Sequence, residues 1–167
     1  TAGNPPYQLS DGGYGVSASP IYQLFVDQAK KLSPRYLSMI IPARWFSGGK
    51  GLNSFRNSML NDNRLRVIHD YPEATDCFQG VQIKGGICYF LWNRDHGGDC
   101  AVTTHHNGQV SSTVERPLKE DGNDIFIRYN IAVGILKKAL LCEEGTMTSL
   151  VSSQKPFGLR TYVHGHS

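Results

Sequence analysis

The chain has 167 residues, of which 40% are hydrophobic and 19% are charged, and its formal net charge is +3. The length suits one domain with part of a second, and the apolar fraction is ordinary for a soluble globular protein. The sequence has no apolar run long enough to span a membrane and does not begin with a signal peptide, which predicts a cytoplasmic protein. Residues 1–70 hold eight Lys or Arg against four acidic residues, a pattern that favours a solvated basic face and only weakly a nucleic-acid partner.

Cysteine and histidine spacing does not indicate a metal centre. The cysteines lack Cys-x-x-Cys spacing, which predicts reduced, partly buried thiols at Cys77, Cys88, Cys100 and Cys142. His164 and His166 are interpreted as solvated residues near the C-terminus rather than as a metal-binding pair.

The most chemically specific motif is Asn4-Pro5-Pro6-Tyr7. Two consecutive prolines fix φ and remove two backbone donors, which favours an extended segment with bare carbonyl groups beside the Asn4 amide. The Asn4 side-chain oxygen and the Pro5 carbonyl can accept hydrogen bonds from an exocyclic amine such as N6 of adenine, and Tyr7 can stack on the ring. A turn opened by Asn-Pro and stiffened by the second proline is the alternative interpretation.

A glycine-containing loop and a helix follow the motif. The loop from Leu9 to Ser19 lacks the Lys-Ser/Thr ending of a phosphate-binding loop, so it either closes over a bound base or is a flexible connection. Ser19 as cap and Pro20 at the first position predict a helix that ends at Ser33-Pro34. Helical spacing predicts that its buried face carries Ile21, Leu24, Phe25, Ala29 and Leu32.

The next elements read as strand, helix and strand. The mostly apolar run Tyr36 to Ile41 predicts a buried parallel strand, followed by a helix that buries Leu52, Phe55, Met59 and Leu60 and ends at Asn61-Asp62-Asn63, and then a strand from Leu65 to Tyr71. Arg44, Trp45 and Lys50 follow the C-terminal end of the first strand, where open α/β sheets bind ligands. Trp45 is expected in the core, whereas Arg44 and Lys50 either contact a ligand or are solvated.

Later elements are a hairpin, a change of composition and a third helix. Residues 77–83 and 86–92 are predicted to form two strands joined through Lys84-Gly85-Gly86, whose glycines permit positive φ. The short polar stretches after residue 95 suggest a domain boundary there. A helix is expected from Ile131 to Glu143, capped by Asn130 and stopped by Gly145, with buried positions at Leu136, Ala139 and Leu140.

Taken in order, these features resemble the catalytic half of N6-adenine DNA methyltransferases of the restriction-modification type. The resemblance rests on Asn4 to Tyr7, the loop, helix and strand after it, and Pro42-Ala43-Arg44-Trp45-Phe46, and it is strongest up to Trp92. It implies an α/β fold: the C-terminal half of a Rossmann-like methyltransferase sheet, ending in an antiparallel hairpin. Residues 1–95 would be the catalytic half and residues 96–167 the start of a mixed target-recognition region.

The resemblance also implies roles for individual residues. Asn4 and Pro5 would polarise the amine of a base flipped out of duplex DNA, Pro6 would shape the backbone, and Tyr7 and Phe78 would stack on the base. For Phe78 the alternative is an ordinary core position. Expected DNA contacts are Arg44, Lys50, Lys155 and Arg160, the last two in a basic segment that is otherwise an exposed loop.

S-adenosylmethionine is the implied cofactor, and its Gly-rich motif and ribose-binding acid belong upstream of Asn4 in the family. The chain is therefore expected to be a fragment that does not methylate on its own. The expected partner of the full protein is a restriction subunit or an upstream nuclease domain. The strand expected before Asn4 is absent, which predicts an unpaired sheet edge beside Tyr36 to Ile41 and self-association there, measurable by sedimentation. Two alternatives stay open: a non-catalytic DNA-recognition subunit on the same scaffold, and methylation of a glutamine or an RNA base.

Overall fold

The computed structural model describes residues 1–9, 19–142, 147 and 150–151. The chain divides into two compact units, Thr1–Gly134 and Ile135–Ser167. The elements in chain order are β1 (Ala2–Gly3), α1 (Tyr22–Lys31), β2 (Tyr36–Pro42), η1 (Ala43–Phe46), α2 (Asn53–Leu60), β3 (Leu65–Tyr71), η2 (Ala74–Asp76), β4 (Ile87–Asn93), β5 (Cys100–His106), β6 (Gln109–Arg116) and α3 (Asn130–Leu140), where η denotes a 3-10 helix.

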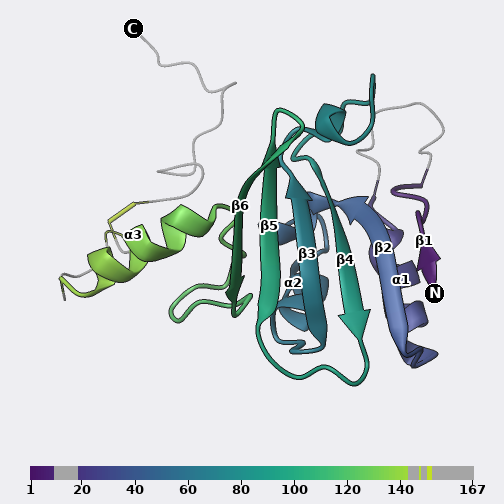
Figure 1. Ribbon diagram of the computed structural model, residues 1–167, viewed down its shortest axis with the longest axis horizontal. Coiled ribbons are helices and arrows are strands. Elements are labelled where there is room, and N and C mark those ends of the chain that lie inside the picture. Colours follow the sequence, from purple (N-terminus) through teal and green to yellow (C-terminus); the bar gives the residue numbers. More distant parts are fainter. Residues whose placement is uncertain (10–18, 143–146, 148–149, 152–167) are drawn as a thin grey trace, which may run out of the picture. The chain divides into compact units, whose positions relative to one another are not determined.

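The six strands form one open sheet in the order β1-β2-β4-β3-β5-β6 (Figure 1). β1 is parallel to β2 and β3 is parallel to β5, whereas β4 runs antiparallel to both β2 and β3, between which it lies. The expected α/β class is confirmed at the level of a mixed α/β fold with an open sheet.

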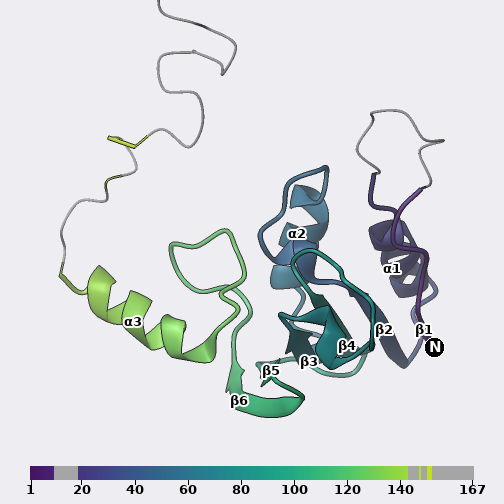
Figure 2. The same ribbon diagram turned by 90° about the horizontal axis from the view of Figure 1, so that it is seen from above.

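One face of the sheet carries the core. In β2 the alternate residues Leu37, Met39 and Ile41 are buried, because successive strand side chains point to opposite faces. Helices α1 and α2 both lie over this face (Figure 2). Trp45 of η1 is fully buried as expected and packs edge-on against Phe55 of α2 with ring centroids 5.8 Å apart. The strand expected at 36–41, the helix expected after it and the strand expected at 65–71 are all present, and β2 is parallel to β1 but antiparallel to β4.

Helix α1 buries a different face from the one its apolar spacing suggests. Tyr22, Val26 and Ala29 are in the core, whereas Leu24, Phe25 and Leu32 are exposed, with Leu32 at 81%. The two apolar stripes share Ala29. The stripe that contains Tyr22 is the buried one, because the Tyr22 ring packs against the Phe55 ring with centroids 6.0 Å apart. The expected Ser19 cap is also wrong, since the residue before the first helical turn is Ile21 and no side chain caps the helix.

The hairpin expected from residues 77–83 and 86–92 is wrong in its first strand. Residues 77–83 form a turn-rich segment after η2, in which Gly80 has φ of +75°, and β4 instead pairs with β2 and β3. An antiparallel hairpin does close the sheet, but it is β5–β6. Its turn is Asn107-Gly108, with φ of +52° and +71°, the pair that best suits a two-residue hairpin turn.

The sheet continues past residue 95, where composition suggests a domain boundary. β5 pairs with β3 in the middle of the sheet, and the compact unit extends to Gly134. The change of composition therefore does not coincide with a break in the sheet, and a recognition role for residues 96–167 stays a proposal.

At the opposite side, β2 is not a bare edge, because Ala2 and Gly3 pair with Ser38 and Met39. Self-association through this side of the sheet stays a prediction.

Helix α3 begins at Asn130, but Asn130 is not its cap. The Asn130 amide instead accepts a hydrogen bond from Arg116 Nε at 2.9 Å and donates to the Val102 carbonyl at 3.0 Å, which ties the start of α3 to β5 and β6. Of the positions expected to be buried, Leu136 is half-buried, and Ala139 and Leu140 are exposed. Among the described residues of the second unit no core surrounds them; Gly145 lies outside the described residues.

A tight turn at Ile83–Gly86 leads into β4, and Gly86 is required there. The Gly86 N–H donates to the Ile83 carbonyl at 2.9 Å and its φ is +78°. A Cβ on Gly86 would lie 2.2 Å from the Tyr71 carbonyl oxygen and 2.5 Å from that of Pro72, both of which are backbone atoms that cannot rotate away.

We therefore expect Gly86→Ala to destabilise the protein by at least about 2 kcal/mol, from steric overlap and left-handed strain together. The matched control is Gly85→Ala, whose φ is +92° but whose Cβ would meet nothing within 4 Å, so that strain alone should cost about 1 kcal/mol. Urea denaturation of the two variants measures the difference. Equal losses would contradict the steric argument.

All four cysteines are free: Cys88 and Cys100 are buried, and Cys77 and Cys142 are exposed. In the part of the chain that the structure describes, no group of three or more metal-ligating side chains gathers, and no helix is long and apolar enough to cross a membrane.

Candidate functional site

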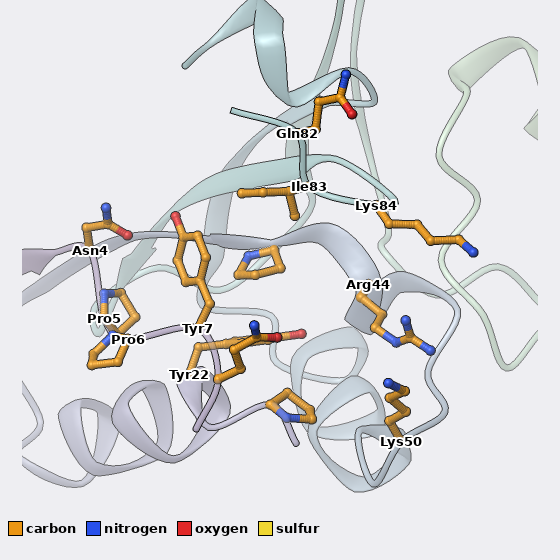
Figure 3. Close-up of a pocket in the computed structure, with 13 residues that line it drawn as sticks. Asn4, Pro5, Pro6, Tyr7, Tyr22, Arg44, Lys50, Gln82, Ile83 and Lys84 are labelled. Atoms are coloured by element: carbon orange, nitrogen blue, oxygen red, sulfur yellow. The ribbon is translucent and has the colours of Figure 1, made fainter. Parts of the chain in front are cut away.

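The motif at the start of the chain forms one end of a cavity of about 630 Å³ (Figure 3). The wall combines the N-terminal segment, the C-terminal end of β2 with the loop after it, and the turn before β4. The lining residues are Asn4, Pro5, Pro6, Tyr7, Gln8, Pro20, Tyr22, Pro42, Arg44, Lys50, Gln82, Ile83 and Lys84. The structure thus brings together the whole motif, Arg44 and Lys50, as expected for ligand groups at the C-terminal end of a strand.

Backbone hydrogen bonds hold the motif at both ends. Before it, Gly3 is paired with Met39 in the sheet. After it, the Tyr7 carbonyl accepts from the Ile21 N–H at 3.1 Å, and the Leu9 N–H donates to the Ser19 carbonyl at 3.2 Å. Asn4 to Tyr7 is therefore an extended bridge between the sheet and the start of α1, as the two prolines predict.

This end of the cavity offers acceptors and an aromatic ring. Among the described residues, no hydrogen bond occupies the Pro5 carbonyl, and Asn4 is exposed with its side-chain amide directed toward Tyr7 (Figure 3). The Tyr7 ring packs partly against the core, and its hydroxyl is buried beside the Asn4 side chain. Burial raises the pKa of Tyr7, with further contributions from Cys77 and Cys88, and the Asn4 side chain opposes the rise, so the hydroxyl is neutral at physiological pH.

The opposite end of the cavity is cationic, because Arg44, Lys50 and Lys84 line it and no acidic residue is among the lining residues (Figure 3). Arg44 belongs to η1, where its neighbours Trp45 and Phe46 are buried and anchor the turn. Lys50, with φ of +47°, stands in a loop fastened by two α2 side chains: Asn53 Oδ1 accepts from Gly49 N at 3.0 Å, and Arg56 Nη1 donates to the Ser47 carbonyl at 2.8 Å.

Lys84 occupies the turn at Ile83–Gly86, which two contacts hold against the rest of the unit. The Gly86 carbonyl accepts from the Ala43 N–H at 3.0 Å, which joins the turn to η1. The Gly85 carbonyl accepts from Arg128 Nη2 at 2.7 Å, and Arg128 also pairs with Asp70, its Nε lying 2.7 Å from Oδ2. A residue far along the chain therefore fastens one wall of the cavity.

The other sequence-derived candidates lie elsewhere. Phe78 is half-buried in the segment after η2 and does not line the cavity, although its role in stacking stays a prediction. Lys155 and Arg160 lie outside the described residues, as does the glycine-rich loop at 10–18. Sequence reasoning missed Tyr22, Gln82 and Lys84 as lining residues. For Lys84 a signal existed, since a cation beside two glycines sits at the tip of a turn.

The described residues do not assemble a complete site for S-adenosylmethionine. The acid that the resemblance implies for the cofactor ribose is not on this wall, whose lining residues include three cations and no carboxylate. The wall provides two acceptors and an aromatic ring at one end and three cationic side chains at the other.

Known proteins match this part of the chain. Residues 2–78 match the family model described as Eco57I restriction-modification methylase. An "Uncharacterized adenine-specific methylase" from Mycoplasma pneumoniae is 39% identical over 114 residues, which cover 66% of this chain and 27% of that protein. Among solved structures, the type I restriction-modification system methyltransferase subunit from Streptococcus thermophilus aligns with a TM-score of 0.45 and 12% identity, over 87% of this chain and 32% of that chain. The resemblance to restriction-modification methylases is confirmed, and residues 2–78 are similar to the Eco57I restriction-modification methylase family.

Proposed function

We propose that this chain is the catalytic part of an enzyme that methylates the N6 amine of adenine in double-stranded DNA, within a cytoplasmic restriction-modification system. One observation carries the proposal: Asn4 to Tyr7 line the cavity and lie inside the segment that matches a restriction-modification methylase family. The similarity to the Mycoplasma pneumoniae protein named as an adenine-specific methylase supports adenine as the base.

The motif residues act on the amine. In duplex DNA the N6 amine is hydrogen-bonded inside the stack, so the base leaves the stack at a cost of about a few kcal/mol. The Asn4 side-chain oxygen and the Pro5 carbonyl accept the two N6 hydrogens and so localise the nitrogen lone pair, while Tyr7, and with it Phe78, stacks on the ring. Pro6 keeps the segment extended.

S-adenosylmethionine is the proposed methyl donor, and its main binding motif is expected outside the described residues. Its methyl group is already activated by the sulfonium charge, so the chain has to position and polarise the amine but needs no nucleophilic side chain.

The basic residues outside the motif complete the proposal. Arg44 and Lys50 contact DNA beside the flipped base, and Lys155 and Arg160 contact DNA as part of a target-recognition region at 96–167. A restriction subunit or a nuclease domain is the proposed protein partner, because methylation in such a system protects DNA from cleavage.

The test is transfer of labelled methyl from S-adenosylmethionine to mixed-sequence duplex DNA by the full-length protein, followed by digestion to nucleosides. We expect the label in N6-methyladenine. DNA binding without transfer would favour the non-catalytic recognition subunit, and label in a glutamine peptide or RNA instead of DNA would move the function to that substrate.

A further inference from the structure

A second cavity, of about 500 Å³, lies beside the candidate site. Its lining residues are 72–75 and 81–85, all from the segment between β3 and β4. Gln82, Ile83 and Lys84 line both cavities, so a wall of three residues separates the two. The Gln82 amide points away from the motif at residues 4–7 (Figure 3). Neighbouring bases of one DNA strand are about 3.4 Å apart along the helix, so the base beside the one that enters the first cavity lies near this wall.

Backbone contacts hold this segment in place. Ala74 is buried, and its carbonyl accepts hydrogen bonds from the Cys77 N–H at 3.1 Å and from the Phe78 N–H at 2.8 Å. The Val81 N–H donates to the Phe78 carbonyl at 3.2 Å, and Arg128 holds the turn that follows. Exposed loops that a rigid scaffold positions in this way commonly carry binding side chains.

The second cavity differs from the first in its charge. Three of its lining residues, Glu73, Thr75 and Gln82, have exposed polar side chains that a ligand can reach. Its lining holds one acid, Glu73, and one base, Lys84, whereas the first cavity has three cations and no acid. DNA phosphates repel a carboxylate, so a carboxylate on a surface beside DNA is favourable where it accepts a hydrogen bond from a base amine. The second cavity therefore suits the edge of a base rather than a phosphate.

We infer that residues 72–85 read the base pair next to the target adenine, with the Glu73 carboxylate accepting a hydrogen bond from an exocyclic amine of that pair. In direct readout the usual partner of a carboxylate is the N4 amine of cytosine. Glu73 therefore selects cytosine beside the methylated adenine, and Thr75 and Gln82 contact the same base pair. The inference rests on the proposed function, because it needs an adenine in the first cavity. It adds a determinant of sequence specificity outside residues 96–167.

The test maps the sequences around every N6-methyladenine that the full-length protein forms in duplex DNA of random sequence, with S-adenosylmethionine as donor. We expect the wild type to prefer cytosine, in either strand, at a position next to the methylated adenine. Glu73→Gln should reduce this preference at least about fivefold, the discrimination of one base-edge contact, and Gln82→Ala should weaken it at the same position. Glu115→Gln, which changes an exposed acid of β6 that lines neither cavity, is the matched control and should leave the preference unchanged.

Each outcome decides the inference. N6-methyladenine formed with the same neighbouring-base preference in the wild type, Glu73→Gln and Gln82→Ala overturns it and leaves the proposed function standing. A Glu73→Gln variant that loses transfer equally at every sequence has lost a structural contact rather than a base contact, which also overturns it. If the wild type forms no N6-methyladenine, the proposed function fails and the inference fails with it.

Discussion

Asn4→Ala should lower the rate of methyl transfer by at least about 100-fold, the loss seen when one preorganised hydrogen-bonding group is removed from a reacting centre. The Asn4 oxygen is one of two acceptors proposed for the N6 hydrogens, and the Pro5 carbonyl alone cannot localise the lone pair. The loss should fall on kcat, with DNA affinity changed by no more than about twofold, because the contact matters most when the amine attacks. Single-turnover transfer and a separate DNA-binding titration measure the two quantities.

The Asn4 side chain is exposed, which separates this effect from folding. Its truncation should change stability by no more than about 0.5 kcal/mol. Gln8→Ala is the matched control, since Gln8 is also an exposed amide on the cavity wall but stands after the motif. If Gln8→Ala lost as much activity as Asn4→Ala, the specific role of Asn4 would be wrong.

Tyr7 provides a second comparison within the motif. Its hydroxyl is buried with the Asn4 side chain beside it, and Tyr7→Phe removes the hydroxyl but keeps the aromatic ring, so this variant should keep the stacking face. Tyr7→Ala should lose the stacking face, which is worth about 1–3 kcal/mol per base. Transfer assays of the two variants at equal DNA concentration distinguish the ring from the hydroxyl, and a loss in Tyr7→Phe equal to that in Tyr7→Ala would contradict a stacking role.

How far the sequence predicts this molecule depends on whether the deciding contacts are local. The strand at Leu65–Tyr71 and the helix at Asn53–Leu60 were predictable, because the spacing of apolar residues in each segment indicates a single type of element. Helix α1 has two apolar stripes, and only the Phe55 ring, more than thirty residues away, selects the one with Tyr22. The β5–β6 hairpin has a strong local signal in Asn107-Gly108, but its threonine-rich strands resemble polar loops.

The candidate site also combines residues that a local motif predicts with residues that only tertiary contacts bring together. Four lining residues come from one contiguous motif whose chemistry can be read from residue types, so the base end was predictable. Lys84 joins the site only because β4 inserts between β2 and β3 and brings the Ile83–Gly86 turn beside η1. Arg128 holds that turn across a separation of 43 residues from Gly85, a contact that no local pattern indicates.

The second large effect is expected at Arg128, because Asp70 depends on it. Asp70 has no exposed surface, and Arg128 meets its carboxylate with Nη2 at 2.9 Å from Oδ1 and Nε at 2.7 Å from Oδ2. Arg128→Met keeps much of the side-chain volume but leaves a buried carboxylate without its charge partner. At pH 8 this should destabilise the protein by about 3–5 kcal/mol.

The pKa of Asp70 makes the loss depend on pH. Burial raises this pKa to about 6, against the opposing effect of Arg128, so the folded chain binds the proton more tightly than the unfolded chain. This group therefore favours folding below the ordinary Asp pKa of about 3.9 and loses that contribution as the pH rises through about 6. Without Arg128 the pKa rises further, so Arg128→Met should cost less at pH 5, where the carboxyl is protonated, than at pH 8.

A double variant isolates the ion pair from the rest of Arg128. Asp70→Asn removes the charge that Arg128→Met would leave unpaired, so Arg128→Met/Asp70→Asn should be more stable at pH 8 than Arg128→Met alone. Urea denaturation of the single and double variants at pH 5 and pH 8 measures both effects. A loss in Arg128→Met that is the same at both pH values and is not relieved by Asp70→Asn would instead assign the effect to the Gly85 contact or to the packing of Arg128 over Phe46. If the loss in Arg128→Met is instead smaller at pH 5 than at pH 8 and is relieved by Asp70→Asn, one wall of the cavity depends on the ion pair between Arg128 and Asp70. Arg128 lies outside residues 2–78, which match the methylase family, so this ion pair is supplied by the later part of the same compact unit.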